Sequence, residues 1–200
     1  MKKAVQIFLL LLIVFLGYLI TVSINQPIKF KNEKERRDNK TIQRLKDIRT
    51  AEVAFKSKYD RYTGSFDTLI NFAKRDSFVV VKQIGSEEDS IAVARKQIVR
   101  EKIKISVRDS LFKKIDVDSL RFVPYTGGRN QFELAAGVLE TASKVKVKVF
   151  ECKVPYDILY WGMDHQQVVN LTNDKKDLDQ YPGLMVGSLK AATNNAGNWE

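Results

Sequence analysis

The chain carries few of the side chains that catalyse reactions or bind metal ions. His165 is its only histidine and Cys152 its only cysteine. One imidazole beside Asp164 makes neither a metal cluster nor a catalytic triad, and no nucleophile, base and orienting group occur together. A single cysteine provides neither an internal disulfide nor a cysteine zinc site, and its apolar surroundings predict a small buried residue. The sequence therefore predicts no enzyme, no cofactor and no metal centre.

Loop motifs for phosphate and calcium do not match either. Gly127-Gly128 lacks the Lys and Ser/Thr of a phosphate-binding loop, and it does not open a predicted helix. The acidic segments 87–89 and 174–179 lack the spacing and the central glycine of a calcium-binding loop. Neither kind of segment predicts an ion-binding site.

An Asp, a hydroxyl residue and an aliphatic residue follow one another at four places in the chain. The hydroxyl residues of these triplets are Thr68, Ser90, Ser110 and Ser119. The triplets resemble the O-glycosylation acceptor of proteins exported by Bacteroidota, which would make these four residues glycosylation sites. Asp-Ser pairs are also common at helix starts, where the side chain caps free backbone N–H groups. Both interpretations stay open.

Six aromatic residues fall near predicted loops and form a second group with a candidate role. They are Tyr125, Tyr156, Tyr160, Trp161, Tyr181 and Trp199. Exposed rings would stack on a glycan or another envelope polymer. Buried rings would instead fill the core of a small sheet, which is the commoner role of such residues.

Residues 4–24 (AVQIFLLLLIVFLGYLITVSI) contain no charge and predict the element that attaches the chain to a membrane. As a helix they would extend roughly 31 Å, close to the ~30 Å hydrocarbon core of a bilayer. A cleaved secretory signal is the alternative, with Met1-Lys2-Lys3 as its basic region. The apolar run is longer than in such signals and no Ala-x-Ala-like site follows it. We therefore expect an uncleaved, single-pass signal anchor.

The two flanks of this segment predict opposite orientations. Residues 29–40 hold six Lys and Arg residues, so a bare count would place the C-terminal side in the cytoplasm. However, the short basic tip at residues 1–3 opens directly into the apolar run, as in export signals, and long domains translocate largely regardless of charge. We expect a bacterial inner-membrane protein with a cytoplasmic N-terminus and a periplasmic domain.

The remainder of the chain suits a charged stalk, residues 25–40, and one domain, residues 41–200. Apolar residues make up 44% of the chain, which is enough for a core. The net charge of +10 is spread along the sequence rather than concentrated on one element. This distribution favours solubility and attraction to an anionic surface, and it does not predict nucleic-acid binding.

From Thr41 the sequence shows a helical period in one apolar stripe. Its members are Leu45, Ile48, Ala51 or Glu52, Phe55, Tyr59 and Tyr62. We expect the stripe to pack on the protein's own sheet, while Leu45 and Ile48 could instead face a partner. Glu52 could pair with Arg49 or Lys56 across one helical turn.

The later sequence predicts one short helix and several strands. Ser65 is a suitable cap for a helix that turns Phe66, Leu69, Ile70 and Phe72-Ala73 inward. A charged excursion begins at residue 87. Predicted strands cover residues 77–84, 101–107, 120–125, 131–139, 144–152 and 184–189. The third and fourth of these would form a hairpin around Gly127-Gly128. The expected fold is α+β, with the amphipathic helix packed on a twisted antiparallel sheet of five or six strands.

An apolar helix followed by an amphipathic helix and an antiparallel sheet resembles the type IV pilins and pseudopilins. Residues 49–73 (RTAEVAFKSKYDRYTGSFDTLINFA) resemble the end of the long helix, the turn and the short helix of that family. The family's processing signal is a Gly before the apolar run and a Glu five residues into it. Here Gly17 lies inside the run and the first Glu is Glu33. The resemblance thus implies a pilin-like domain on a permanent anchor.

Two features would separate the apolar helix from the amphipathic one, namely Pro27 and the charged stalk. Residues 181–200 also resemble an uncharacterised family of single-pass envelope proteins of Bacteroidota, from which no function carries over. We expect a non-enzymatic, membrane-anchored subunit of a cell-envelope assembly with envelope proteins as partners. The alternative is a membrane-anchored binding module for an envelope polymer or glycan.

Overall fold

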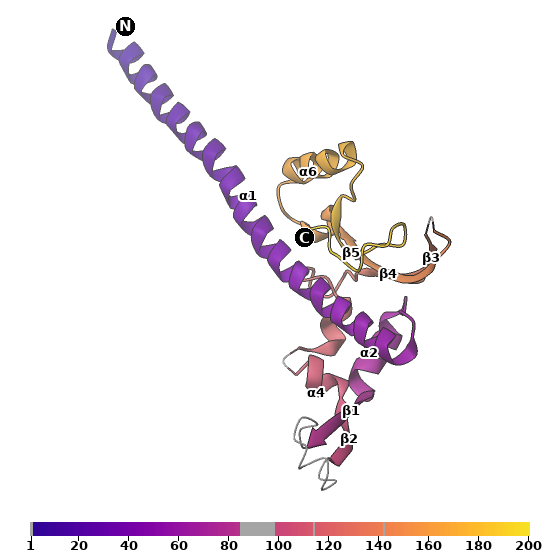
Figure 1. Cartoon of the computed structure of the whole chain (residues 1–200). Coiled ribbons are helices and arrows are strands. Elements are labelled where there is room, and N and C mark those ends of the chain that lie inside the picture. The colour runs from indigo at the N-terminus through magenta and orange to yellow at the C-terminus, as the bar shows by residue number, and fades with distance from the viewer. Residues whose placement is uncertain (1, 85–98, 114, 142) are drawn as a thin grey trace.

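One long helix, α1 (Lys2–Tyr59), extends from the N-terminus into the domain (Figure 1). The computed structural model describes residues 2–84, 99–113, 115–141 and 143–200. The described apolar side chains of α1 up to Ile24 are exposed, and none of the domain covers them. Among the described residues, this is the one helix long and apolar enough to cross a membrane.

Pro27 lies inside α1, so the expected break between two helices was wrong. A proline in a helix removes one backbone hydrogen bond and bends the helix, but the helix can continue beyond it. Residues 25–40 are therefore helical as well. Their charges support the helix, because Lys34 pairs with Asp38 at 2.7 Å and Glu33 pairs with Arg37 at 2.9 Å, each across one turn.

The second half of α1 forms the centre of the core. Leu45, Ile48 and Ala51 are fully buried and Phe55 is 3% exposed, which confirms the predicted packing of this stripe inside the domain. α1 contacts β4 and β5 of the larger sheet. Near the end of the stripe Tyr59 is 46% exposed, whereas Tyr62, which follows α1, is buried.

The short helix α2 (Phe66–Arg75) lies against the end of α1, as the sequence predicts. Its buried residues are Phe66, Leu69, Ile70, Phe72 and Ala73, the same five that the pattern turned inward. The ring of Phe72 meets that of Phe55 edge to face, with 5.2 Å between centroids. Ser65 occupies the cap position, although its side chain makes no capping hydrogen bond.

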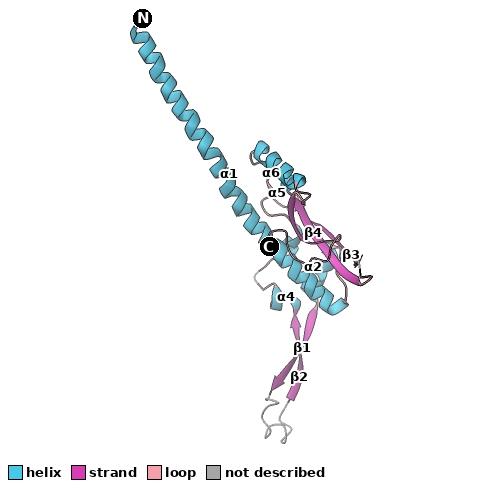
Figure 2. Cartoon of the chain, turned by 45° about the horizontal axis from the view of Figure 1, so that its top comes forward, coloured by secondary structure: helices cyan, strands magenta, loops and turns pink. Residues whose placement is uncertain are grey.

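The described strands form two separate antiparallel sheets of two and three strands, so the expected single sheet of five or six strands is not confirmed. β1 (Ser77–Ile84) pairs with β2 (Val99–Ser106), and this ribbon projects away from the larger sheet (Figures 1 and 2). The larger sheet has the order β3 (Glu133–Glu140), β4 (Lys146–Pro155) and β5 (Gly183–Gly187). The strands predicted at residues 77–84, 101–107, 144–152 and 184–189 are confirmed with small shifts. The charged excursion from residue 87 lies outside the described residues.

The predicted hairpin around Gly127-Gly128 forms only in part. In its first arm, Leu120 and Arg121 belong to the 3₁₀ helix η1 (Val117–Arg121), which follows the helix α4 (Val107–Leu111). The side chain of Asp116 accepts the backbone N–H of Asp118 and so starts η1. The strand pairing is reduced to one bridge between Phe122 and Gln131, and β3 pairs with β4 instead.

One face of β4 is exposed at the start of the strand and buried farther along, and the strand contains no bulge. Lys146 and Lys148 begin this face at the surface, whereas Phe150, Cys152 and Val154 continue it into the core. The register with β3 is continuous across the change. The face becomes buried where Tyr62 covers Phe150, with 4.9 Å between ring centroids. Cys152 is fully buried, as predicted.

Two helices connect β4 to β5 and were not resolved by the sequence pattern. They are α5 (Tyr156–Leu159) and α6 (His165–Asp177). α6 lies beside the middle of α1, between the domain core and the apolar end of that helix (Figure 1). β5 ends at Gly187, which has a φ of +70° and passes close to the carbonyl of Phe150, a position that requires glycine.

Candidate functional site

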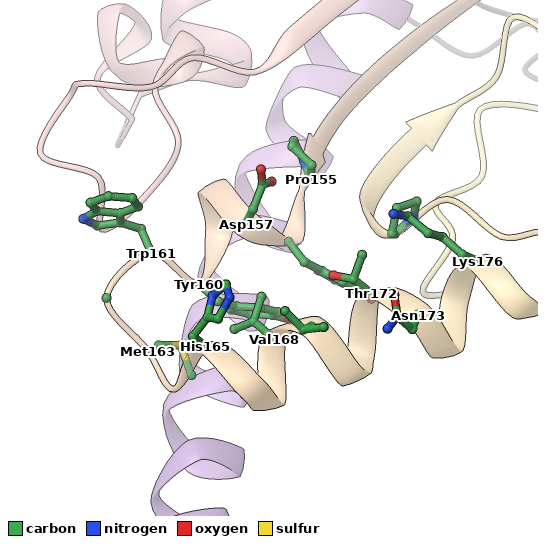
Figure 3. Close-up of a pocket in the computed structure, with 14 residues that line it drawn as sticks. Pro155, Asp157, Tyr160, Trp161, Met163, His165, Val168, Thr172, Asn173 and Lys176 are labelled. Carbon is green, nitrogen blue, oxygen red and sulfur yellow. The ribbon is translucent and has the colours of Figure 1, made fainter.

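A pocket of about 740 Å³ lies between α5, the loop that follows it and α6 (Figure 3). This volume is within the range of sites that bind small molecules, roughly 300–1,000 Å³. Tyr156 and Tyr160 line one wall. Trp161 lies at the start of the loop between the two helices. The pocket therefore contains three of the six aromatic residues for which the sequence left core and binding roles open.

α6 presents one face to the pocket through its helical period. His165, Val168, Thr172 and Lys176 recur at three and four residues and all line it. Figure 3 shows His165, Val168 and Thr172 directed from α6 toward the segment that carries Asp157 and Pro155. Val168 is the apolar residue of this face. His165 lies on its N-terminal side, and Thr172 and Lys176 lie on its C-terminal side.

The opposite wall is held by a stack of two tyrosines. The rings of Tyr156 and Tyr160 lie 5.2 Å apart at an angle of 22°, and both side chains are buried. The hydroxyl of Tyr160 donates to Oδ1 of Asp38 at 2.6 Å. Burial is the main cause that raises the pKa of both phenols, so they stay neutral. These rings shape the wall rather than supply a base or a nucleophile.

Arg37 fixes the loop after α5 onto α1. One guanidinium nitrogen donates to the backbone carbonyl of Leu159 at 3.1 Å and to that of Trp161 at 2.9 Å. Another nitrogen donates to Glu33 at 2.9 Å. The backbone of the loop is thereby held in place, while the side chain of Trp161 remains 74% exposed.

The N-terminal end of α6 meets α1 at the limit of its apolar segment. Nε2 of Gln26 donates to Oδ2 of Asp164 at 2.6 Å. The other oxygen of Asp164 accepts the backbone N–H of Gln167 at 3.0 Å and caps α6. Gln26 lies two residues beyond Ile24, about 3 Å along the helix axis. The Trp161–His165 end of the pocket is therefore close to the membrane surface if residues 4–24 span a bilayer.

The polar groups of the pocket do not form a reacting constellation. Asp157, His165 and Lys176 line it at separate points, on two different elements. Within the described ranges no three His, Cys, Asp or Glu side chains come together in a way that could hold a metal ion. The arrangement suits binding of a mostly apolar group, with the polar atoms at its edge.

The candidate glycosylation residues lie on separate elements and differ in access. Thr68 on α2 and Ser110 on α4 are exposed. Ser119 is half-buried in η1, where its hydroxyl donates to the carbonyl of Asp116 at 2.6 Å and accepts from Arg44 at 2.7 Å. Ser90 lies outside the described residues. The structure thus leaves Thr68 and Ser110 as the accessible positions.

Leu45 and Ile48, the possible partner-facing residues, lie fully inside the core. No surface at these two positions is left for a partner. Of the other aromatic residues, Tyr125 is 46% exposed, and Arg36 stacks over its ring at 5.0 Å. Tyr181 and Trp199 are partly buried.

The sequence interpretation missed a buried carboxyl group. Glu52 is fully buried and does not pair with Arg49 or Lys56 as expected. Its Oε2 accepts the backbone N–H of Thr63 at 3.0 Å, and Oε1 has no partner among the described residues. Burial raises the pKa of Glu52 to about 8, so the group is mainly protonated at neutral pH. Its place on an otherwise apolar stripe is the signal that could have revealed it.

Comparisons of the chain with protein-family models, with curated proteins and with solved structures each found no match.

Proposed function

We propose that the chain is a non-enzymatic, membrane-anchored subunit of a bacterial cell-envelope assembly. One observation supports this most directly: α1 joins an exposed apolar segment to the core of the domain without interruption. A soluble protein rarely leaves so large an apolar surface uncovered. The domain is consequently held on a stiff helical connection at a set distance from the bilayer, which suits a part that must meet other envelope proteins in a defined position.

The arrangement of α1 on the larger sheet favours a pilin-like role for the domain. The second half of α1 packs on β4 and β5 of an antiparallel sheet, and α2 follows it after a short turn. The first half remains free, as in a subunit whose apolar helix stays in the membrane. The site described above adds no reacting groups, which is consistent with a subunit that binds rather than catalyses.

In the proposed orientation the N-terminus is cytoplasmic and the domain is periplasmic, with the chain in the inner membrane. Lys2 and Lys3 then flank the cytoplasmic side. A reporter fused after Glu200 tests this orientation, because a reporter that is active only in the periplasm should work there. Activity of a reporter that works only in the cytoplasm, without activity of the periplasmic reporter, would show that the orientation is the reverse of the proposed one.

The assembly itself is tested by crosslinking in native membranes. The full chain should be joined to one or a few envelope proteins in constant proportion, through residues of the domain. Replacing residues 4–24 by an unrelated apolar anchor should leave these crosslinks intact if the domain makes the contacts. Absence of any reproducible protein partner would refute the subunit proposal.

A further inference from the structure

We infer that the pocket between α5 and α6 binds one acyl chain of a phospholipid from the membrane in which α1 is anchored. This inference does not depend on the proposed envelope assembly, because the pocket belongs to the isolated chain. It concerns a lipid as a bound ligand, in addition to the lipid that surrounds the apolar segment of α1.

The lining of the pocket matches an aliphatic chain. Its walls are formed mainly by the apolar parts of Pro155, Tyr160, Met163, Val168, Val169 and Pro182. An apolar group that leaves water for such a surface is stabilised in proportion to the apolar area that it buries. Thr172, Asn173 and Lys176 lie farther toward the C-terminus of α6, whereas His165 lies at its start, so the polar side chains of this helix are at the two ends of the apolar surface.

The position of the pocket gives a lipid chain a short path into it. The hydrogen bond between Gln26 and Asp164 holds the start of α6 about 3 Å along the helix axis from the last apolar residue of the span. Trp161 and Met163, which precede α6, are then at the depth of the headgroups. Tryptophan favours this interface because its ring is apolar and its N–H is polar.

Basic side chains on α1 can hold the charged part of the lipid. Lys29 and Lys31 are exposed and lie roughly 8 and 11 Å along the helix axis beyond Ile24. Lysines close to a membrane surface attract anionic headgroups. An anionic phospholipid can therefore leave its headgroup at the surface while one chain enters the pocket.

A glycan fits the same pocket less well. A sugar ring binds to the free face of an aromatic ring, but Tyr156 and Tyr160 are buried and stacked on each other. Trp161 alone, among the pocket's aromatic residues, offers an exposed ring. The apolar wall would also leave most sugar hydroxyl groups without partners.

The test uses the purified full chain in nanodiscs of phosphatidylethanolamine and phosphatidylglycerol. A fraction of the phosphatidylglycerol carries a photoactivatable diazirine near the end of one acyl chain, and labelled peptides are mapped by mass spectrometry. We expect label on Met163, Val168 or Val169 as well as on the apolar part of α1. Label confined to residues 4–24 and Trp161 would mean contact with the bilayer surface only and would overturn the inference.

Two matched substitutions locate the label in the pocket. Val168→Trp fills the pocket and should reduce labelling of α6 to background, whereas Val138→Trp on the exposed surface of β3 should leave it unchanged. Val169→Phe, at the less buried edge, provides a second filling variant if Val168→Trp fails to fold. Equal labelling of the filled variants and Val138→Trp would contradict the inference. Muropeptides in excess should not change the labelling, and displacement of the lipid by them would assign the pocket to a glycan instead.

Discussion

The carboxyl group of Glu52 accepts the backbone N–H of Thr63 at 3.0 Å inside the core. This bond ties the last turns of α1 to the turn that leads into α2. The other carboxyl oxygen has no partner among the described residues. Burial is the main cause that raises the pKa of the nearby thiol of Cys152, and Glu52 adds to it. A proton on Glu52 removes the cost of a buried charge, so this part of the core is built around a neutral carboxyl group.

The first prediction is that stability falls as pH rises from about 4.5 to about 8. Because the pKa of Glu52 is raised to about 8 by folding, the folded state binds more protons than the unfolded state in this window. The contribution of Glu52 is thus fully present below about pH 4.5 and is lost as pH rises to about 8. The slope for one proton is about 1.4 kcal/mol per pH unit.

Urea unfolding of the full chain in detergent, repeated across this range, measures the effect. Glu52→Gln keeps an acceptor for Thr63 and should flatten the pH profile. Glu35→Gln, at an exposed position on the same helix, should leave the profile as it is in the original chain. Parallel profiles for the original chain and Glu52→Gln would show that Glu52 does not titrate as described.

The second prediction concerns Phe55, which packs against Phe72. Phe55→Ala should lower the free energy of unfolding by about 3–5 kcal/mol, because it leaves a cavity in a core where the side chain is 3% exposed. Val53→Ala is the control, since Val53 lies on the same helix but is 46% exposed. It should change stability by no more than about 0.5 kcal/mol. If both variants melt at the same temperature, α1 does not pack on the domain.

The third prediction separates core and partner roles at Leu45. Since Leu45 is fully buried, Leu45→Ala should cost about 2–5 kcal/mol and should affect complexes only through this loss. Thermal unfolding and crosslinking in membranes, measured on the same variant, distinguish the roles. Unchanged stability together with a lost complex would mean that the residue faces a partner.

The fourth prediction concerns the clamp that Arg37 places on the loop after α5. Arg37→Lys keeps the charge but cannot reproduce the fixed fork that reaches two carbonyls, so the amides of residues 160–165 should exchange faster with deuterium. Arg36→Lys is the matched control, because the side chain of Arg36 is 62% exposed and that of Arg37 only 15%. Equal exchange in the two variants would argue against the clamp.

Some elements were predictable because neighbouring residues suffice to define them. α2 shows its inward face in ten residues, and β1 coincides with the strand predicted at residues 77–84. The first arm of the hairpin was mispredicted because Leu120 and Arg121 belong to η1, which buries Val117 and Leu120 three residues apart and is capped by the side chain of Asp116. Glu52 was missed because a carboxyl group on an apolar stripe normally turns to solvent. Here the tertiary packing around α1 buries the group instead.

The sequence by itself determined the apolar segment that is long enough to span a membrane and the inward stripe of α1. Each depends on residue type and spacing along one element. Only the tertiary structure decided that α1 continues through Pro27, that the described strands divide into two sheets and that a pocket opens beside the end of the domain nearest the apolar segment. These features depend on contacts between residues far apart in the chain, such as Gln26 with Asp164 and Arg37 with Trp161. Such contacts form only when several elements have already been placed, so no local pattern records them.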